Sequence, residues 1–258
     1  MLHRPGASAT IGAAAAAKAP ADGYTIVFVT ATHVISPLLM QVPYDPIKDF
    51  APITPISNVE VMLVAHPSIP VKNLQELIEL AKARPSQLNY ATSTAGSASH
   101  LAAELFSMRA GIRMQPIAYK GGGPAVSELL GGQVGLYFGN PVNVAGHVSA
   151  GRLRALAVSG ERRLPGLQQV ATFGESGFAN FDVGFWQGIL APAGTPRPII
   201  DRIALEVARI LAMPDMKEKI NSLGGDPYVM SPDDFAARMK LDSVRYAEVI
   251  KKRNIKID

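Results

Sequence analysis

Short apolar runs alternate with helical apolar repeats along most of the chain. Strand-like runs fall at residues 24–30, 114–118, 134–138 and 153–158. Between them apolar residues recur every three or four positions, the spacing that places them on one face of an α-helix. The connections are short and rich in Gly, Pro and Asp. This alternation of strands and helices predicts an α/β fold.

Capping residues mark where several of these helices begin. Asn73, followed by Glu76, predicts the start of a helix that ends at Pro85. Thr195 and Ser231, each followed by proline, are expected to cap the starts of two further helices. The last of these helices ends in a turn rich in Lys and Arg, which complements the helix dipole.

The segment Leu88 to Leu101 predicts a strand, a loop of hydroxyl-bearing residues and glycine, and the first turn of a helix. Backbone N–H groups and the positive end of the helix dipole favour a carboxylate or phosphate at such a position. The alternative is that Ser97 or Ser99 only caps the helix, which is the more common use of such residues. The pattern of this segment alone leaves both interpretations open.

Three other loops also follow a predicted strand: Thr30 to His33, Tyr119 to Gly121, and Gly139 to Pro141. In open α/β sheets, ligands bind outside the carboxyl ends of the strands. We therefore expect the four loops to line one crevice that offers hydroxyls, an amide and backbone N–H groups. The run Lys120-Gly-Gly-Gly lacks the Gly-Lys-Ser/Thr ending of a phosphate loop, so a flexible helix entry is its simpler interpretation.

The length of the chain, 258 residues, exceeds the usual size of one hydrophobic core and favours two domains. Apolar extended segments at residues 59–64 and 182–188 could carry the chain between them. We expect a discontinuous lobe 1 of residues 1–63 and 186–258 and an inserted lobe 2 of residues 64–185. Two crossovers of this kind form a hinge over a cleft.

Composition excludes several classes of protein. Hydrophobic residues make up 48% of the chain and charged residues 18%, which favours a folded interior over disorder. No apolar run reaches the roughly 18 residues of a membrane span. The absence of cysteine excludes disulfides and thiolate metal sites. The net charge of +4 comes from scattered Lys and Arg residues, so nucleic-acid binding is not expected.

No catalytic motif is present in the sequence. It has neither a Gly-x-Ser-x-Gly elbow nor a His-Glu-x-x-His pair, and its five histidines never fall at metal-ligand spacing. We therefore predict a protein that is not an enzyme and that has no metal or cofactor. Trp186, the single tryptophan, lies at the return crossover, where core packing is favoured over a role in the cleft.

Motifs along the whole chain resemble the Bug family, the TctC-like extracytoplasmic solute receptors of tripartite tricarboxylate transporters. Among them are Arg4-Pro-Gly-Ala, Asn89-Tyr-Ala-Thr-Ser and Tyr119-Lys-Gly. Further matching segments, in the same order and with similar spacing, are residues 18–25, 43–52, 100–106, 129–134, 150–158 and 191–196. Gly139 departs from the pattern, since an acidic residue is common there in the family.

The resemblance implies a two-lobed type II periplasmic-binding-protein fold in a periplasmic monomer that binds a small carboxylate and delivers it to membrane permease subunits. Relative to the family pattern we expect lobe 1 to lack its first strand–helix unit. Alternatives are a sensor domain that reports carboxylate occupancy to a signalling partner, and a truncated remnant that binds no ligand. The positions that fall on the segments lining the family's cleft are Thr32, His33, Ser93, Thr94, Gly96, Ser97, Tyr119, Lys120 and Asn140.

Overall fold

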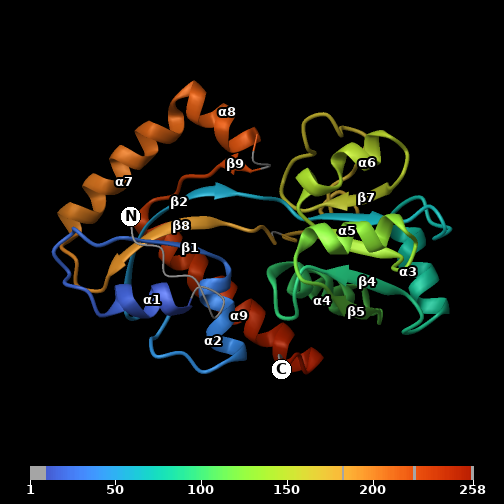
Figure 1. The fold of residues 1–258 in the computed structure, drawn as a ribbon, viewed down its shortest axis with the longest axis horizontal. Helices are drawn as coiled ribbons and strands as arrows, with labels where there is room; N and C mark the ends of the chain where they lie inside the picture. The colour runs from blue at the N-terminus through green and yellow to red at the C-terminus, as the bar shows by residue number, and fades with distance from the viewer. Residues whose placement is uncertain (1–9, 182, 223–224, 257–258) are drawn as a thin grey trace. The chain divides into compact units, whose positions relative to one another are not determined.

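The computed structural model describes residues 10–181, 183–222 and 225–256 (Figure 1). Helices and strands alternate along the chain, which confirms the predicted α/β class. The chain forms two compact units. Unit 1 comprises Met1–Asn58 and Phe185–Asp258, and unit 2 comprises Val59–Gly184. The hinge and the cleft expected from the sequence remain predictions.

Unit 1 is built on a four-stranded antiparallel sheet in the order β1-β8-β2-β9. Figure 1 shows α7 and α8 on one side of these strands and α1 and α2 on the other. A small core of Ile53, Ala191 and Ile200 joins β2, β8 and α7. The elements are α1 (Thr10–Ala17), β1 (Val27–Thr30), α2 (Thr32–Leu39), β2 (Phe50–Asn58), β8 (Gln187–Pro192), α7 (Arg197–Ala212), α8 (Pro214–Ser222), β9 (Asp226–Pro227) and α9 (Pro232–Arg253).

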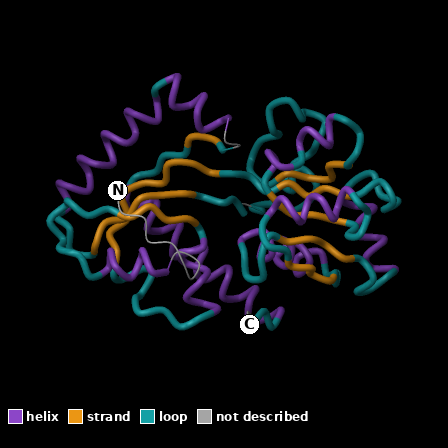
Figure 2. The backbone as a smooth tube through the Cα atoms, in the orientation of Figure 1, coloured by secondary structure: helices purple, strands orange, loops and turns teal. Residues whose placement is uncertain are grey.

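Unit 2 is built on a five-stranded mixed sheet in the order β5-β4-β6-β3-β7 (Figure 2). Strand β4 pairs in parallel with β5 and with β6, whereas β3 is antiparallel to β6 and to β7. The elements are β3 (Met62–Ala65), α3 (Leu74–Ala83), β4 (Asn89–Thr92), α4 (Ala98–Ala110), β5 (Gln115–Ala118), α5 (Gly122–Leu130), β6 (Leu136–Gly139), the 3-10 helix η2 (Pro141–Asn143), α6 (Ala145–Ser149) and β7 (Arg154–Val158).

The two faces of the unit 2 sheet carry different cores because successive side chains of a strand point to opposite faces. Tyr90 and Phe138 lie on the face that packs against Phe106 of α4. Ala91 and Tyr137 lie in the cluster formed with Val126 and Leu129 of α5. Helices thus cover both faces and leave the ends of β4, β5 and β6 as the place where loops emerge.

The helix starts test the predicted caps. Asn73 accepts a hydrogen bond from the Glu76 N–H, and Ser231 accepts one from the Asp234 N–H, so both caps are confirmed. The prediction for Thr195 was wrong. Pro196 holds the cap position of α7 with no side-chain cap, because the Thr195 hydroxyl donates to the Pro192 carbonyl at 2.8 Å.

Among the described residues, none of the helices could cross a membrane.

Candidate functional site

The carboxyl ends of three neighbouring parallel strands lie at one edge of the unit 2 sheet. Thr92, at the end of β4, is paired in register with Ala118 at the end of β5. On the other side of β4, Ala91 is paired with Tyr137 of β6. The loops that begin at Ser93, Tyr119 and Asn140 therefore emerge side by side, as expected for three of the four predicted segments.

Backbone hydrogen bonds tie the first two of these loops together. The N–H of Tyr119 donates to the Thr92 carbonyl at 3.0 Å, and the N–H of Gly121 donates to the Ser93 carbonyl at 2.9 Å. Lys120 lies between these two bonds and its side chain is exposed. The backbone of Lys120 is thus held beside the 93–97 loop, and its exposed ammonium group can attract an anion there.

Four hydroxyl groups cluster at the start of α4. Thr92 Oγ1 lies 2.9 Å from both Ser97 Oγ and Ser99 Oγ, which are themselves 2.9 Å apart. Ser93 Oγ lies 3.2 Å from Ser99 Oγ. Ser97 Oγ also donates to the Thr94 carbonyl at 2.6 Å. A hydroxyl that rotates away from its present partner can donate to a bound carboxylate. Thr92 and Ser99 complete the cluster although neither was among the predicted site residues.

The first turn of α4 also offers backbone donors. Ser97 Oγ accepts from the His100 N–H and the Ser97 carbonyl accepts from the Leu101 N–H, so Ser97 is the N-cap. The N–H groups of Ala98 and Ser99 belong to the first turn, which has no acceptor within a helix. Gly96, with φ of 70°, provides the left-handed residue that the loop needs before the cap. The capping interpretation is therefore confirmed for Ser97, and anion binding at the same turn stays a prediction.

Tyr119 and Asn140 flank this helix start. Tyr119 packs against the α5 side of the core. Burial, with the nearby Glu128 charge as a second cause, raises the pKa of its phenol, so the group stays neutral and can donate a hydrogen bond. Asn140 caps η2, since its Oδ1 accepts from the Val142 N–H at 2.9 Å. The amide of Asn140 also carries an NH2 group that can donate at this edge.

Gly139, the departure from the family pattern, is explained by Tyr137. A Cβ atom at residue 139 would meet the Tyr137 ring, which is 2% exposed. We expect Gly139→Ala to lower the free energy of unfolding by about 1–3 kcal/mol, the usual effect of overpacking. Gly146→Ala is the matched control, because a Cβ at that helical position meets nothing within 4 Å. Urea unfolding of both variants checks this, and equal stabilities would contradict the clash.

Thr94 is exposed in the 93–97 loop, and its Oγ1 donates to the Ser93 carbonyl at 2.6 Å. The last two predicted residues, Thr32 and His33, lie in unit 1 at the start of α2. Thr32 Oγ1 shares a hydrogen bond of 2.7 Å with Thr30 Oγ1 at the end of β1. His33 is 5% exposed and lies among aromatic rings, stacked on Tyr44 at 5.6 Å and in edge contact with Phe50 at 4.7 Å. Its Nε2 donates to the Pro46 carbonyl at 3.0 Å. The hydroxyls of Thr30 at the end of β1 and Thr32 at the start of α2, rather than the imidazole, are the polar groups available here.

Burial makes His33 a pH-dependent element of stability. It lowers the pKa of the imidazole from 6.5 to about 4, against the opposing effect of the Pro46 hydrogen bond. The unfolded chain therefore binds more protons between these values, and the free energy of unfolding falls as pH drops from 6.5 to about 4. The expected loss is about 3 kcal/mol.

His33→Gln tests this dependence because its amide can donate to Pro46 but does not titrate. We expect urea unfolding at a series of pH values to give a flatter profile for His33→Gln than for the wild type. Parallel profiles would show that His33 does not set the acid sensitivity.

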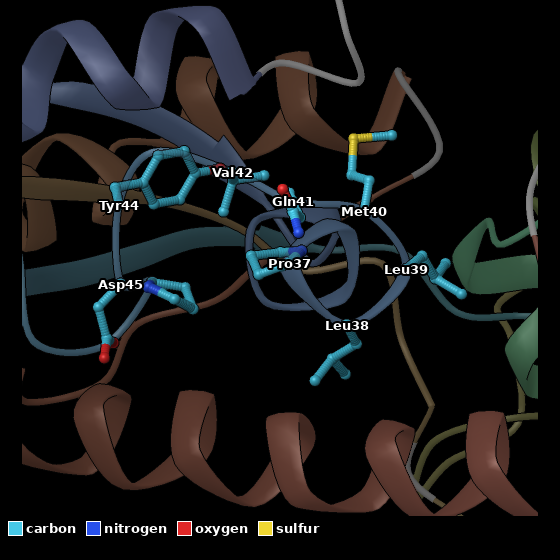
Figure 3. A pocket seen from close by; sticks show the side chains of 9 residues that line it. Pro37, Leu38, Leu39, Met40, Gln41, Val42, Tyr44 and Asp45 are labelled. Carbon is cyan, nitrogen blue, oxygen red and sulfur yellow. The ribbon is translucent and has the colours of Figure 1, made fainter.

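A separate concave surface of about 710 Å³ lies at the other end of α2, lined by residues 37–42 and 44–46 (Figure 3). Gln41 and Asp45 line it together with Pro, Leu, Met, Val and Tyr residues. The Asp45 carboxylate on its rim accepts from the N–H groups of Ile47 and Lys48 at 2.9 Å each. None of the predicted binding residues lines it, so it is distinct from the strand-end site.

Two further expectations concern metal binding and the role of Trp186. The described part of the chain contains no group of three or more His, Asp or Glu residues able to hold a metal ion. Trp186 is fully buried, and its indole N–H donates to Asp242 Oδ2 at 2.9 Å. The structure thus places Trp186 in the core of unit 1.

Comparisons with known proteins show which family the chain is similar to. The family model described as "Tripartite tricarboxylate transporter family receptor" matches residues 2–255. BugT of Bordetella pertussis is 33% identical over 258 residues, which is 99% of this chain and 79% of that protein.

Two solved structures of relatives contain carboxylates. Rpa4515 of R. palustris with adipate has a TM-score of 0.80 at 33% identity, covering 98% of this chain and 85% of that one. MatC of Rhodopseudomonas palustris with bound malate has a TM-score of 0.74 at 29% identity, covering 95% of this chain and 85% of that one.

Proposed function

The chain belongs to the tripartite tricarboxylate transporter receptor family, whose members are solute-binding receptors and not enzymes, and we propose that it captures a small carboxylate in the periplasm for the permease subunits of such a transporter. The adipate and malate bound by the two relatives support a carboxylate as the class of ligand. Neither relative fixes which carboxylate this chain binds.

The observation that carries the proposal is the edge of the unit 2 sheet where three parallel strands end. It combines the hydroxyl cluster around Ser97, the first-turn N–H groups of α4 and the exposed Lys120. Hydrogen-bond donors to an ionised oxygen form stronger bonds than donors to a neutral one. A carboxylate therefore fits this edge better than an uncharged solute does.

We propose direct ligand contacts for most of the predicted residues. From unit 1 we include Thr32 as a hydroxyl donor and assign His33 an indirect role, because its Nε2 is used by Pro46. From unit 2 the proposed ligand contacts are Ser93, Thr94, Gly96, Ser97, Tyr119, Lys120 and Asn140.

A ligand panel tests the proposal. Purified protein is titrated by calorimetry with mono-, di- and tricarboxylates, malate and adipate among them, and with their uncharged diamides as controls. We expect at least one carboxylate to bind and to raise the thermal midpoint, and the matching diamide to do neither. A panel in which no carboxylate binds would overturn the proposal.

Delivery to a transporter needs its own test. Deleting the gene in its host is expected to abolish uptake of the bound carboxylate, and wild-type protein is expected to restore it. Unchanged uptake would contradict the transport role while leaving carboxylate binding intact.

A further inference from the structure

A buried polar group lies directly behind the 93–97 loop. The backbone N–H of Gly96 donates to His100 Nδ1 at 3.0 Å, and this bond is buried. One turn further along α4, Glu104 Oε1 accepts from the Tyr90 hydroxyl of β4 at 2.6 Å. Tyr90, His100 and Glu104 are at most 6% exposed. The loop is thus held from inside by a side chain of the helix that it precedes.

The hydrogen bond fixes the state of the imidazole. A backbone N–H can only donate, so Nδ1 of His100 carries a lone pair and the proton of the neutral ring is on Nε2. Burial, opposed by the charge of Glu104, lowers the pKa of His100. Tyr90 of β4 also lies against the ring, with its ring centroid 6.3 Å away, and Phe138 of β6 lies next to Tyr90. The folded protein therefore favours the uncharged, accepting imidazole.

Gly96 is the residue whose conformation this bond controls. Its φ of 70° lies in the left-handed region, and the next residue is the N-cap Ser97. The direction of the Gly96 N–H fixes the peptide plane between residues 95 and 96. That plane determines how residues 93–95 approach the hydroxyl cluster at the start of α4. A rotation at Gly96 would therefore displace the donors of the site without touching the ligand.

We propose that His100 is a positioning residue of the carboxylate site: its uncharged imidazole holds Gly96 in place, and protonation of the ring releases the loop and weakens carboxylate binding. The effect on affinity rests on the proposed function, whereas the effect on the loop does not. Protonation would place an N–H opposite the Gly96 N–H, so two donors would face each other at the present distance of 3.0 Å.

Two variants separate the hydrogen bond from the ring. His100→Asn retains an acceptor oxygen near the position of Nδ1 and does not titrate. His100→Leu removes the acceptor and keeps an apolar side chain in the core. At neutral pH the Gly96 N–H is expected to stay hydrogen-bonded in His100→Asn and to lose this bond in His100→Leu.

The first measurement needs no ligand. Nitrogen-15 NMR of the wild type is expected to show Nδ1 of His100 unprotonated and the Gly96 amide signal shifting with the same midpoint as the imidazole. In His100→Asn the Gly96 signal should be independent of pH, and in His100→Leu its amide should exchange faster at all pH values. A Gly96 signal that ignores His100 in all three proteins would overturn the inference.

The second measurement uses malate and adipate as probes. Below the titration midpoint of His100, wild-type affinity should fall at least about tenfold relative to His100→Asn, which corresponds to about 1.4 kcal/mol. Protonation of the probe affects all proteins equally, so the ratio isolates His100. A ratio that is constant, or that rises on acidification as simple attraction to a cationic ring would require, would overturn the inference. If the NMR result holds but neither these probes nor the wider panel binds, the proposed function fails and the positioning role stands.

Discussion

Replacing Ser97 by aspartate is expected to abolish carboxylate binding while leaving the fold intact. Ser97 Oγ caps α4 by accepting the His100 N–H, and it also lies 2.9 Å from Thr92 Oγ1. Aspartate is as good an N-cap as serine, because its carboxylate accepts the same hydrogen bond. Its charge, however, occupies the place proposed for the ligand's charge. Like charges a few ångströms apart near a protein surface repel by several kcal/mol.

Ser97→Asn is the matched control, since asparagine caps a helix equally well and carries no charge. We expect Ser97→Asp to lose at least about 100-fold in affinity, or about 3 kcal/mol, and Ser97→Asn to lose less than about tenfold. Calorimetry with the carboxylate identified in the panel provides both values, and the thermal midpoints report on the fold. Equal affinities of the two variants would place the ligand away from this loop.

The sequence predicted best those features of the site that depend on residues close together in the chain. A strand, a loop with Gly96 and a capping Ser97 can be recognised from residue type and spacing alone, because each is defined within a few positions of the chain. The same holds for Asn73 and Ser231, whose caps the structure confirms. Thr195 shows the limit of this reasoning, since its hydroxyl finds the Pro192 carbonyl instead of a helix N–H.

Strand β2 shows a second limit of local patterns. It contains Pro52 and Pro55, residues that normally argue against a strand, and the sequence pattern identified no strand there. The structure accommodates them through shifts in register between Pro52 and Thr54 and between Pro55 and Ser57. Proline lacks the N–H that a ladder needs, so an irregular ladder is where it can be tolerated. Such irregularities depend on the partner strand and are not visible in one segment.

Side-chain partners were the least predictable feature of the site. His33 follows a strand at a position that suits ligand binding, but its ring is held by Pro46, 13 residues away. The bond between Gly96 and His100 had a usable signal, the four-residue spacing of a loop glycine and a polar side chain on the first turn. Thr92 had a weaker one, a polar residue at the buried end of a strand. Position along the chain identifies candidates, and packing decides which of them face a ligand.

A buried ion pair in unit 1 gives the second large expected effect, on stability. Asp242 of α9 is fully buried, and its Oδ2 accepts from Arg238 Nε at 2.8 Å and from Trp186 Nε1 at 2.9 Å. Arg245 lies 3.6 Å from the other oxygen. The Trp186 ring also contacts Phe235 edge to face at 5.2 Å. One carboxylate therefore joins the start of β8 to α9 and neutralises a buried guanidinium.

Asp242→Ala is expected to lower the free energy of unfolding by about 3–5 kcal/mol, the usual result of removing one partner of a buried pair. Arg238 would lose the buried carboxylate to which its Nε donates, and the Trp186 N–H would lose its acceptor. Asp242→Asn should lose less, because its amide oxygen can still accept from Trp186. Urea unfolding followed by the fluorescence of this single tryptophan measures both variants.

The double variant Arg238→Met with Asp242→Leu distinguishes the charge from the packing. Replacing both members of a buried pair by apolar residues of similar volume is often neutral or stabilising. We therefore expect the double variant to recover most of the stability that Asp242→Ala loses, although Trp186 still lacks an acceptor. If Asp242→Ala instead unfolds at the wild-type urea concentration, the carboxylate is dispensable. If the double variant is no more stable than Asp242→Ala, the charge on Arg238 does not determine the loss, which then comes from the hydrogen bond to Trp186 or from the charge on Arg245.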